Sequence, residues 1–420
     1  MISALHPVRW KGPIAALLVA AVSSACADEA DTVGWTTVID TVGGIVRVTN
    51  TPGTETGPTL VAEEELRVGT LSGEGPQSFG LIRSIAVLDD GRFAVADAHA
   101  EEIRLFDGEG QYLRTFGGRG QGPGELAGMQ GVFLDHEGML RVAEQQNGRL
   151  SVFDPDTGFV RSFPVRLSSY GFQGPWAAAI DSTGRTMVAS SGQYGEGRFW
   201  NMLRVYDPFM RQVDSIPYRE YTSDIMDTDD PPGAWRITLG NGFMFAQVPF
   251  FAHAQQVVGP MGEFWTSAEG ATRLEVARWT PPADTSLIMR SLRQPVPVAT
   301  TERDSAMADV RASLEETLLG PPSLDPSRVP STKPPTYGLS LDQRGHLWVR
   351  ITDEYSATTI YDLFEPNGRH SETMAFPFRV DVWIPPIVRG DMVWTVVRDE
   401  SDVQYVVRSR VRASAGSDTP

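Results

Sequence analysis

Residues 66–79 read L-R-V-G-T-L-S-G-E-G-P-Q-S-F, and residues 113–126 repeat this pattern as L-R-T-F-G-G-R-G-Q-G-P-G-E-L. The Leu-Arg pair, two glycines, the proline and the final apolar position match at a constant offset of 47 residues. Such a period is typical of an array of equivalent units, because one unit cannot bury its own apolar faces and must stack on the next.

Between the two copies lie short apolar runs separated by turns rich in Asp and Gly. An apolar run to Val87 is followed by R-F-A-V-A-D (92–97), I-R-L-F-D (103–107) and Y-L-R-T-F (112–116). The turn D-D-G (89–91) recurs in modified form, which gives six units in all. Glycine suits the left-handed position of such turns, and Asp caps the backbone there. Four antiparallel strands per unit form a propeller blade, so the sequence predicts an all-β fold with six four-stranded blades.

Residues 64–411 resemble the six-bladed β-propeller superfamily around the NHL-repeat proteins, particularly its exported bacterial members. The resemblance lies in I-A-V-L-D-D-G-R-F-A-V-A-D (85–97), I-R-L-F-D-G-E-G-Q-Y-L-R-T-F-G (103–117) and G-R-G-Q-G-P-G-E-L (118–126). It fades in blades three and five and is poor in four and six. The resemblance implies the fold; because the family holds binding modules and a few enzymes, it implies no single activity.

The N-terminal region is expected to close the ring. Residues 28–63 favour a tether with one edge strand, G-G-I-V-R-V-T (43–49). The run 65–71 matches the fourth strand of a blade but has no three strands before it. The last unit has only three runs: W-I-P-P-I-V (383–388), M-V-W-T-V-V (392–397) and V-Q-Y-V-V-R-S-R-V (403–411). We therefore expect the N-terminal strand to complete the last blade, leaving 412–420 as a tail.

Two insertions interrupt the propeller. The first insertion, 221–240, begins with an acidic segment, 221–233, whose D-x-x-D-x-D-D spacing lacks the ligand pattern of a calcium loop, which favours a solvated turn. Blade four is expected over about 242–298, marked by the aromatic run 243–251. The second insertion, 299–335, lies between blades four and five and contains apolar residues at helical spacing. Thr300 or Thr301 suits the start of this amphipathic helix, whose apolar residues are Met307, Val310, Leu314 and Leu318.

The first 27 residues form an export signal. Arg9 and Lys11 precede an apolar run that is too short to span a membrane. The chain's one cysteine lies in V-S-S-A-C-A-D (22–28), which resembles a bacterial lipoprotein signal ending at Cys26, although Ser23 stands where leucine is usual. Lipidation of Cys26 implies a periplasmic or cell-envelope lipoprotein; cleavage after Ala27 is the alternative and implies plain secretion.

The net charge of −17 becomes −19 without residues 1–27, which contain two basic and no acidic residues. Such a field repels phosphate backbones and anionic membrane surfaces, and the chain has no Lys/Arg run to overcome it. Nucleic acid is therefore not expected as a partner. Membrane attachment is expected only through a lipid on Cys26.

The loops between blades and after each second strand share one face of a propeller, and binding groups usually lie on such loops. This face is polar, amide-rich and partly aromatic, as a small molecule, glycan or peptide site requires. The candidate binding residues are His99, Arg119, Gln121, Glu125, Glu144, Gln145, Asn147, Gln173, Trp176, Gln193 and Tyr194. Structural roles are the alternative for several of them: Asn147, like Asp97, suits a turn cap, and Glu125 suits bonds within its own loop.

Catalytic signatures are scarce. The histidines have no zinc-ligand spacing, and only His99 and His253 are placed to reach the central funnel. A G-x-S-x-G motif is absent from the sequence. We therefore expect a ligand- or protein-binding propeller without a cofactor. The alternative is an enzyme that uses the funnel, either lyase-like or a calcium-dependent hydrolase or lactonase with Glu144 and Asn147 at the metal.

Overall fold

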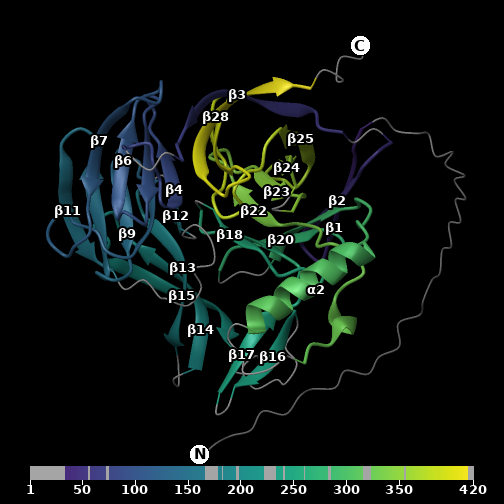
Figure 1. Ribbon diagram of the computed structural model, residues 1–420. Coiled ribbons are helices and arrows are strands. Elements are labelled where there is room, and N and C mark those ends of the chain that lie inside the picture. The colour runs from purple at the N-terminus through teal and green to yellow at the C-terminus, as the bar shows by residue number, and fades with distance from the viewer. Residues whose placement is uncertain are drawn as a thin grey trace, which may run out of the picture.

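The computed structural model describes residues 34–54, 57–71, 75–165, 178–181, 183–194, 198–221, 233–239, 242–259, 261–281, 285–315, 323–353 and 356–414. These residues form a six-bladed β-propeller, as the sequence predicted. In Figure 1 the first strands β4, β12, β18 and β22 lie toward the middle, and the outer strands β7 and β11 lie at the margin. The signal sequence with Cys26 lies outside the described residues.

Blades one and two follow the repeat seen in the sequence. Blade one contains β4 (Ile82–Val87), β5 (Phe93–Asp97), β6 (Glu102–Phe106) and β7 (Tyr112–Gly117). Blade two contains β8 (Met129–Leu134), β9 (Leu140–Glu144), β10 (Arg149–Asp154) and β11 (Gly158–Pro164). All neighbouring strands are antiparallel, so alternate connections lie on opposite faces of the ring.

Blades three to five have the same order. Blade three contains β12 (Ala178–Ile180), β13 (Thr186–Tyr194), β14 (Arg198–Tyr206) and β15 (Gln212–Tyr221). Blade four contains β18 (Gln256–Val258), β19 (Phe264–Ser267), β20 (Glu275–Trp279) and β21 (Thr285–Ser291). Blade five contains β22 (Gly338–Leu341), β23 (Leu347–Arg350), β24 (Thr359–Phe364) and β25 (His370–Phe376).

Blade six is completed by the N-terminal strand, which confirms the predicted ring closure. The C-terminal region supplies β26 (Ile387–Arg389), β27 (Met392–Arg398) and β28 (Gln404–Ala413). The outer strand is β3 (Leu60–Val68), antiparallel to β28. β3 also pairs in parallel with β25, which joins blades five and six into one eight-stranded sheet. W-I-P-P (383–386) was predicted as strand but lies in the link before β26, because its two prolines cannot donate to a ladder.

The N-terminal region reaches further than the single edge strand predicted from the sequence. A hairpin of β1 (Thr36–Val42) and β2 (Ile45–Thr51) extends blade four, with β2 parallel to β21. The left-handed φ angles of Gly43 (61°) and Gly44 (84°) suit its two-residue turn. Buried Asn50 donates to the Gly368 carbonyl (2.9 Å) and accepts from the His370 amide (2.9 Å) in blade five. Residues 34–68 therefore bind the outer edges of blades four, five and six.

The helical insertion packs on a second hairpin outside the blades. β16 (Ala234–Leu239) pairs with β17 (Gly242–Gln247), and α2 (Thr300–Glu315) lies across them (Figure 1). Met307 and Leu314 of α2 share an apolar cluster with the hairpin. This corrects the expected start of blade four: the aromatic run near 243–251 contacts the helix, and the blade begins at Gln256.

The start of α2 also differs from expectation. The Glu302 carboxylate accepts from the Ala299 amide (3.0 Å), and the Arg303 amide donates to the Ala299 carbonyl (3.0 Å). Ala299 is therefore the N-cap, in place of Thr300 or Thr301, because Glu302 satisfies a free amide from within the first turn. A short 3₁₀ turn, η1 (Pro326–Arg328), follows the helix. Among the described helices, none combines the length and apolar character needed to cross a membrane.

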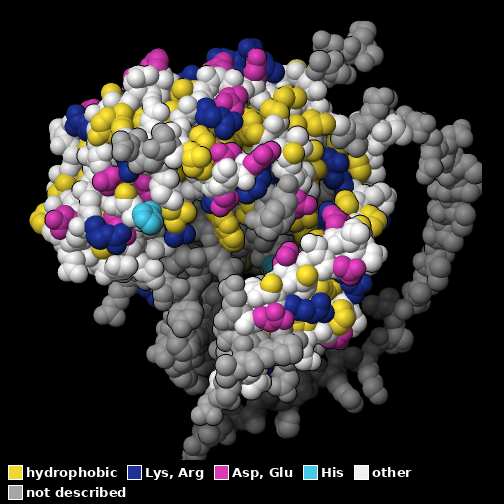
Figure 2. Space-filling view, viewed as in Figure 1, with side chains coloured by type: hydrophobic (Ala, Val, Ile, Leu, Met, Phe, Trp, Pro, Cys, Tyr) yellow, Lys and Arg dark blue, Asp and Glu magenta, His cyan; other side chains and the backbone are white. Residues whose placement is uncertain are grey.

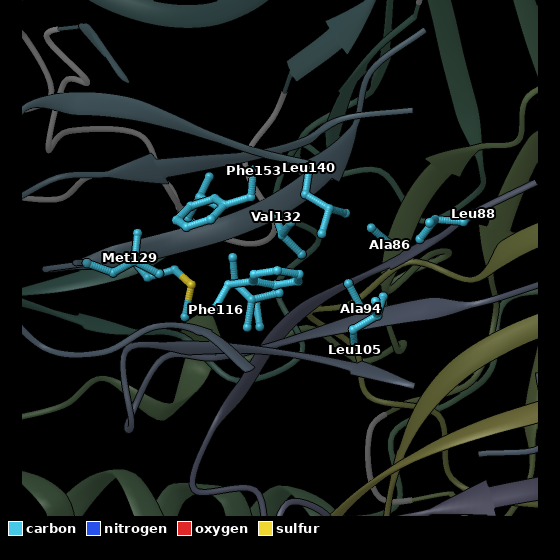
Figure 3. Close-up of a cluster of buried hydrophobic side chains, with 13 residues drawn as sticks. Ala86, Leu88, Ala94, Leu105, Phe116, Met129, Val132, Leu140 and Phe153 are labelled. Carbon is cyan, nitrogen blue, oxygen red and sulfur yellow. The ribbon is translucent and has the colours of Figure 1, made fainter. Parts of the chain in front are cut away.

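Apolar residues between neighbouring blades form the core. Figure 3 shows one such cluster, in which Phe116 of blade one lies near Met129, Val132 and Phe153 of blade two. Ala94 and Leu105 extend this cluster through blade one and are almost fully buried. Each blade is therefore stabilised by the next, as the repeat requires, and the loops rest on a rigid frame.

Candidate functional site

We call the face that carries the blade links and the turns after the second strands the loop face. It includes residues 69–71, 75–81, 98–101, 118–128, 145–148 and 377–386. Figure 2 shows Lys/Arg and Asp/Glu side chains interspersed on the visible surface, without one large patch of either sign. A binding site here must therefore be built from local groups.

Glu144, the last residue of β9, is a structural anchor for the link between blades one and two. Its carboxylate is fully buried and accepts hydrogen bonds from the Asn147 side-chain amide (2.6 Å) and the Ser151 hydroxyl (2.5 Å). It also accepts from the Arg149 guanidinium (3.0 Å) and the Ala127 amide (3.3 Å). Four donors thus satisfy one carboxylate.

Arg149 holds the link itself. Its guanidinium donates to the carbonyls of Gln121 (3.0 Å), Gly122 (3.0 Å) and Glu125 (2.7 Å). Within the link, the Glu125 carboxylate accepts from the Gly122 amide (2.7 Å). The polar groups of G-R-G-Q-G-P-G-E therefore bond to one another, and the motif builds a rigid blade connection.

Blade one repeats this arrangement with different residues. Buried Asp97 accepts from the amides of Gly80 (2.9 Å) and Leu81 (3.1 Å) in the preceding link. Arg104 lies 3.4 Å from Asp97 and donates to the carbonyls of Pro76 and Ser78. An acid at the end of the second strand and an arginine in the third strand therefore recur as a clamp.

The structure brings together most of the predicted residues, but largely in structural roles. Arg119 donates to the His99 carbonyl (3.1 Å), and Gln145 accepts from the Gln130 side chain (3.1 Å). Gln193 and Tyr194 lie at the end of β13. Gln173 and Trp176 lie outside the described residues. His253 packs edge-on against Phe251, and burial lowers the pKa of its imidazole.

The calcium hypothesis named Glu144 and Asn147. The observed contacts do not fit a cation at this position, because Glu144 is already paired with Arg149 and Asn147 presents its amide donor to the carboxylate. In the described part of the chain, three or more His, Cys, Asp and Glu residues nowhere gather in a metal-binding arrangement.

A separate cavity of about 70 Å³ lies where blade six meets blade one. We call it the seam cavity; its lining residues are Leu81, Ile82, Arg83, Asp381, Trp383, Ile384, Arg398 and Gln404. The lining residues are contributed by β4, β27, β28 and the link before β26. Ring closure thus assembles the cavity from segments about three hundred residues apart in the sequence.

Buried polar groups form the floor of the seam cavity. The Asp381 carboxylate accepts from Arg398 (2.7 Å), the Gln404 side chain (2.9 Å) and the Trp383 amide (2.9 Å). Gln404 also bonds both backbone groups of Ile82, at 2.7 and 3.2 Å, and so ties blade six to blade one. Burial opposes the charge of Arg398, but the carboxylates of Asp381 and Asp402 raise the pKa of Arg398 above its usual value.

The free groups of the seam cavity are Arg83 and Trp383. Arg83 is the extra residue of a β-bulge, since the ladder between β4 and β5 slips between Ile82 and Ser84. Its exposed side chain makes no hydrogen bond or ion pair with the rest of the described chain. Trp383 is 53% exposed, and its ring nitrogen likewise lacks a partner among the described residues. A fixed floor with two free groups is suited to binding.

Sequence patterns did not indicate this site. Trp383 was read as part of a strand, and Asp381, Arg398 and Gln404 lie in blade six, where the repeat is poorest. The repeat contained one signal. The position equivalent to Arg83, 47 residues later, is Gln130, so the charged side chain of Arg83 is not part of the repeat. The Gln130 side chain donates to the Gly128 carbonyl and to the Gln145 side chain, whereas the Arg83 side chain has no partner among the described residues.

Comparison with known protein families agrees with the fold. Residues 74–170 match the family DUF5128, described as a 6-bladed beta-propeller. This segment covers blade one, its link and blade two. The comparison with curated proteins returns no match.

Several solved structures are similar to the chain at low identity. A Bacteroides fragilis protein described as exported is 11% identical with a TM-score of 0.47, over 88% of this chain and 99% of its own. A DUF4221 family member from Bacteroides vulgatus is 10% identical with a TM-score of 0.48, over 85% and 99%. A gluconolactonase from Xanthomonas campestris is 10% identical with a TM-score of 0.38, over 84% and 98%.

Proposed function

We propose that this chain is an exported binding protein that holds a ligand at the seam cavity. The observation that carries the proposal is a contrast within the cavity: its buried polar groups are satisfied, whereas the side chains of Arg83 and Trp383 have no hydrogen-bond partner among the described residues. Because the buried polar groups of the cavity are already fixed, little side-chain entropy is lost when a ligand binds. The free polar and aromatic groups can then contact the ligand.

The hydrogen bonds of the buried Asp381 carboxylate support binding better than catalysis. The Asp381 carboxylate is buried and hydrogen-bonded to Arg398, Gln404 and a backbone amide. It is therefore poorly placed to accept a proton from a substrate, since a general base must reach the proton that it removes. Within the described part of the chain, the alternative of an enzyme that uses the funnel, with or without calcium, has no comparable feature in its favour.

Export places this binding site in the cell envelope or outside the cell. We propose that Cys26 is lipidated, which would anchor the chain to a membrane surface. The proposal depends on V-S-S-A-C, in which small residues precede the cysteine. Secretion after cleavage at Ala27 is the other outcome of the same test.

The test is an array of glycans and peptides probed with the mature chain, repeated with Trp383→Ala. We expect binding that Trp383→Ala weakens about tenfold or more, because aromatic anchors carry much of the energy of such sites. Metal analysis of the purified protein accompanies the array. Binding that is unchanged in Trp383→Ala, or bound calcium needed for turnover of a lactone, would contradict the proposal.

A further inference from the structure

Resting on the proposed function, we propose that the ligand of the seam cavity is an acidic saccharide: a sugar ring stacks on Trp383, and its carboxylate pairs with Arg83. The class of ligand follows from the volume of the cavity, the charge that is left free in it and the shape of its exposed wall.

The volume limits what can enter. A cavity of about 70 Å³ is well below the roughly 300–1,000 Å³ of a pocket that encloses a whole small ligand. A carboxylate fits this space, whereas a sugar ring does not. The ring must therefore lie outside the cavity, against the exposed wall.

The charge selects an anionic group. The seam cavity is lined by two arginines, Arg83 and Arg398, and by one aspartate, Asp381. Arg398 is paired with Asp381 (2.7 Å) and Asp402 (3.0 Å), so its charge is already balanced. Arg83 has no such pair among the described residues. Its planar guanidinium matches a carboxylate in two parallel hydrogen bonds.

The exposed wall favours a sugar ring over an apolar ligand. Ile82 and Ile384 are only 2% and 3% exposed, so these aliphatic side chains face the core and offer little apolar surface. The surface presented to a ligand is the Trp383 indole, a flat face with one N–H donor. Such a ring stacks on the C–H face of a sugar while its N–H remains available to a hydroxyl.

The experiment measures binding of oligogalacturonate and oligoglucuronate, and of the neutral oligomers of galactose and glucose, to the mature chain by calorimetry and saturation-transfer NMR. The variants are Arg83→Gln, Trp383→Ala and Trp383→Phe. Arg344→Gln is the matched control, because Arg344 is an exposed arginine in a turn on the opposite face. Thermal unfolding of each variant checks that it is folded.

We expect the acidic oligomers to bind at least about tenfold more tightly than the neutral ones, since hydrogen bonds between charged groups are stronger than those between neutral groups. Arg83→Gln should abolish this preference, Trp383→Ala should weaken both classes, and Trp383→Phe should restore part of the loss. The preference should shrink as salt is added. Arg344→Gln should bind as the wild type does.

Equal binding of acidic and neutral oligomers, or a preference that survives Arg83→Gln, would overturn the acidic-saccharide proposal and leave the binding function intact. Binding of peptides alone, if it depends on Trp383, would have the same meaning. Failure of every ligand to bind in a Trp383-dependent way would overturn both proposals.

Discussion

Glu144 shows how a buried carboxylate can look like a binding group in the sequence and yet hold the frame. Glu144→Gln removes the charge that balances Arg149 and one acceptor for the Ser151 hydroxyl. We expect the free energy of unfolding in urea to fall by about 2–4 kcal/mol, because breaking a buried pair leaves a charge without compensation. The matched control is Glu64→Gln, whose partner Arg67 is exposed and whose loss should cost less than about 1 kcal/mol. If Glu144→Gln and Glu64→Gln lower the free energy of unfolding equally, Glu144 does not hold the link between the blades.

Asp181 makes stability depend on pH. Burial disfavours its charged form, but hydrogen bonds from Thr183 and Arg185 prevail and lower the pKa of Asp181 to about 2. A lowered folded-state pKa stabilises the fold above the unfolded-state value of about 3.9, and this stability is lost as the pH falls toward about 2. We expect Asp181→Asn to be less stable than wild type at pH 6 and to lose less stability by pH 2.5. If the free energies of unfolding of the two proteins fall by the same amount between pH 6 and pH 2.5, the lowered pKa of Asp181 is contradicted.

The residues of the seam cavity could not be found by pattern alone. Asp97 and Glu144 occur in recognisable repeats, so the acid at the end of the second strand was visible in the sequence. Arg83 and Asp381 meet only after ring closure, at a sequence distance over which no local pattern operates. The β-bulge at Arg83 recurs at Gln130 in blade two, so the bulge belongs to the repeat, and what differs is the side chain that it carries.

At the scale of elements, β3 is the strand that holds the ring closed. It pairs with β28 along its length and with β25 at its start. A chain that begins at residue 57 keeps β3 but loses the β1–β2 hairpin; we expect it to fold with reduced stability. A chain that begins at residue 70 exposes the edges of both β28 and β25. We expect its thermal unfolding, followed by circular dichroism, to be no longer cooperative. Similar melting of the two truncations would contradict closure by β3.

Helix α2 stabilises the β16–β17 hairpin through Met307, which is 3% exposed and packs in one cluster with Trp235. Met307→Ser should lower the stability of the unit formed by α2 and the β16–β17 hairpin by about 2–4 kcal/mol, because a buried apolar side chain is lost. The blades should remain folded. Limited proteolysis should then cut near the hairpin while the propeller resists. Asp309→Ser, on the exposed side of the helix, is the control and should behave as wild type. If Met307→Ser unfolds the whole domain, the helix is part of the main core.

For the same insertion, the sequence predicted the helix but not the segment on which it packs. The spacing of Met307, Val310 and Leu314 predicted the helix because an apolar stripe must be buried. The sequence could not identify its partner, since the aromatic residues of 243–251 suit a blade strand and a helix-covering hairpin equally well. Lys333 then links the helix to blade five through Glu302 (2.6 Å) and Asp353 (3.6 Å).

At the scale of the whole molecule, the sequence predicted the number of blades and the closing strand because both follow from counting repeats. It did not predict that residues 34–51 extend blade four, since the pairing of β2 with β21 joins segments far apart in the chain. The stacking of Trp35 on His370, with ring centroids 3.9 Å apart, belongs to the same long-range contact. Blades four to six are thus covered at their edges, whereas β7 and β11 are the last strands of their sheets.

The position of the molecule in the cell depends on Cys26. If this residue is lipidated, cells grown with labelled palmitate should yield labelled wild-type protein in the membrane fraction. Cys26→Ser should remove the label and release the protein, because one thiol carries the acyl anchor. Ser24→Ala is the matched control, since it alters the signal beside the cysteine and keeps the thiol. Unlabelled wild type, in a host that labels its other lipoproteins, would instead assign the chain to plain secretion after Ala27, with the seam cavity free in solution.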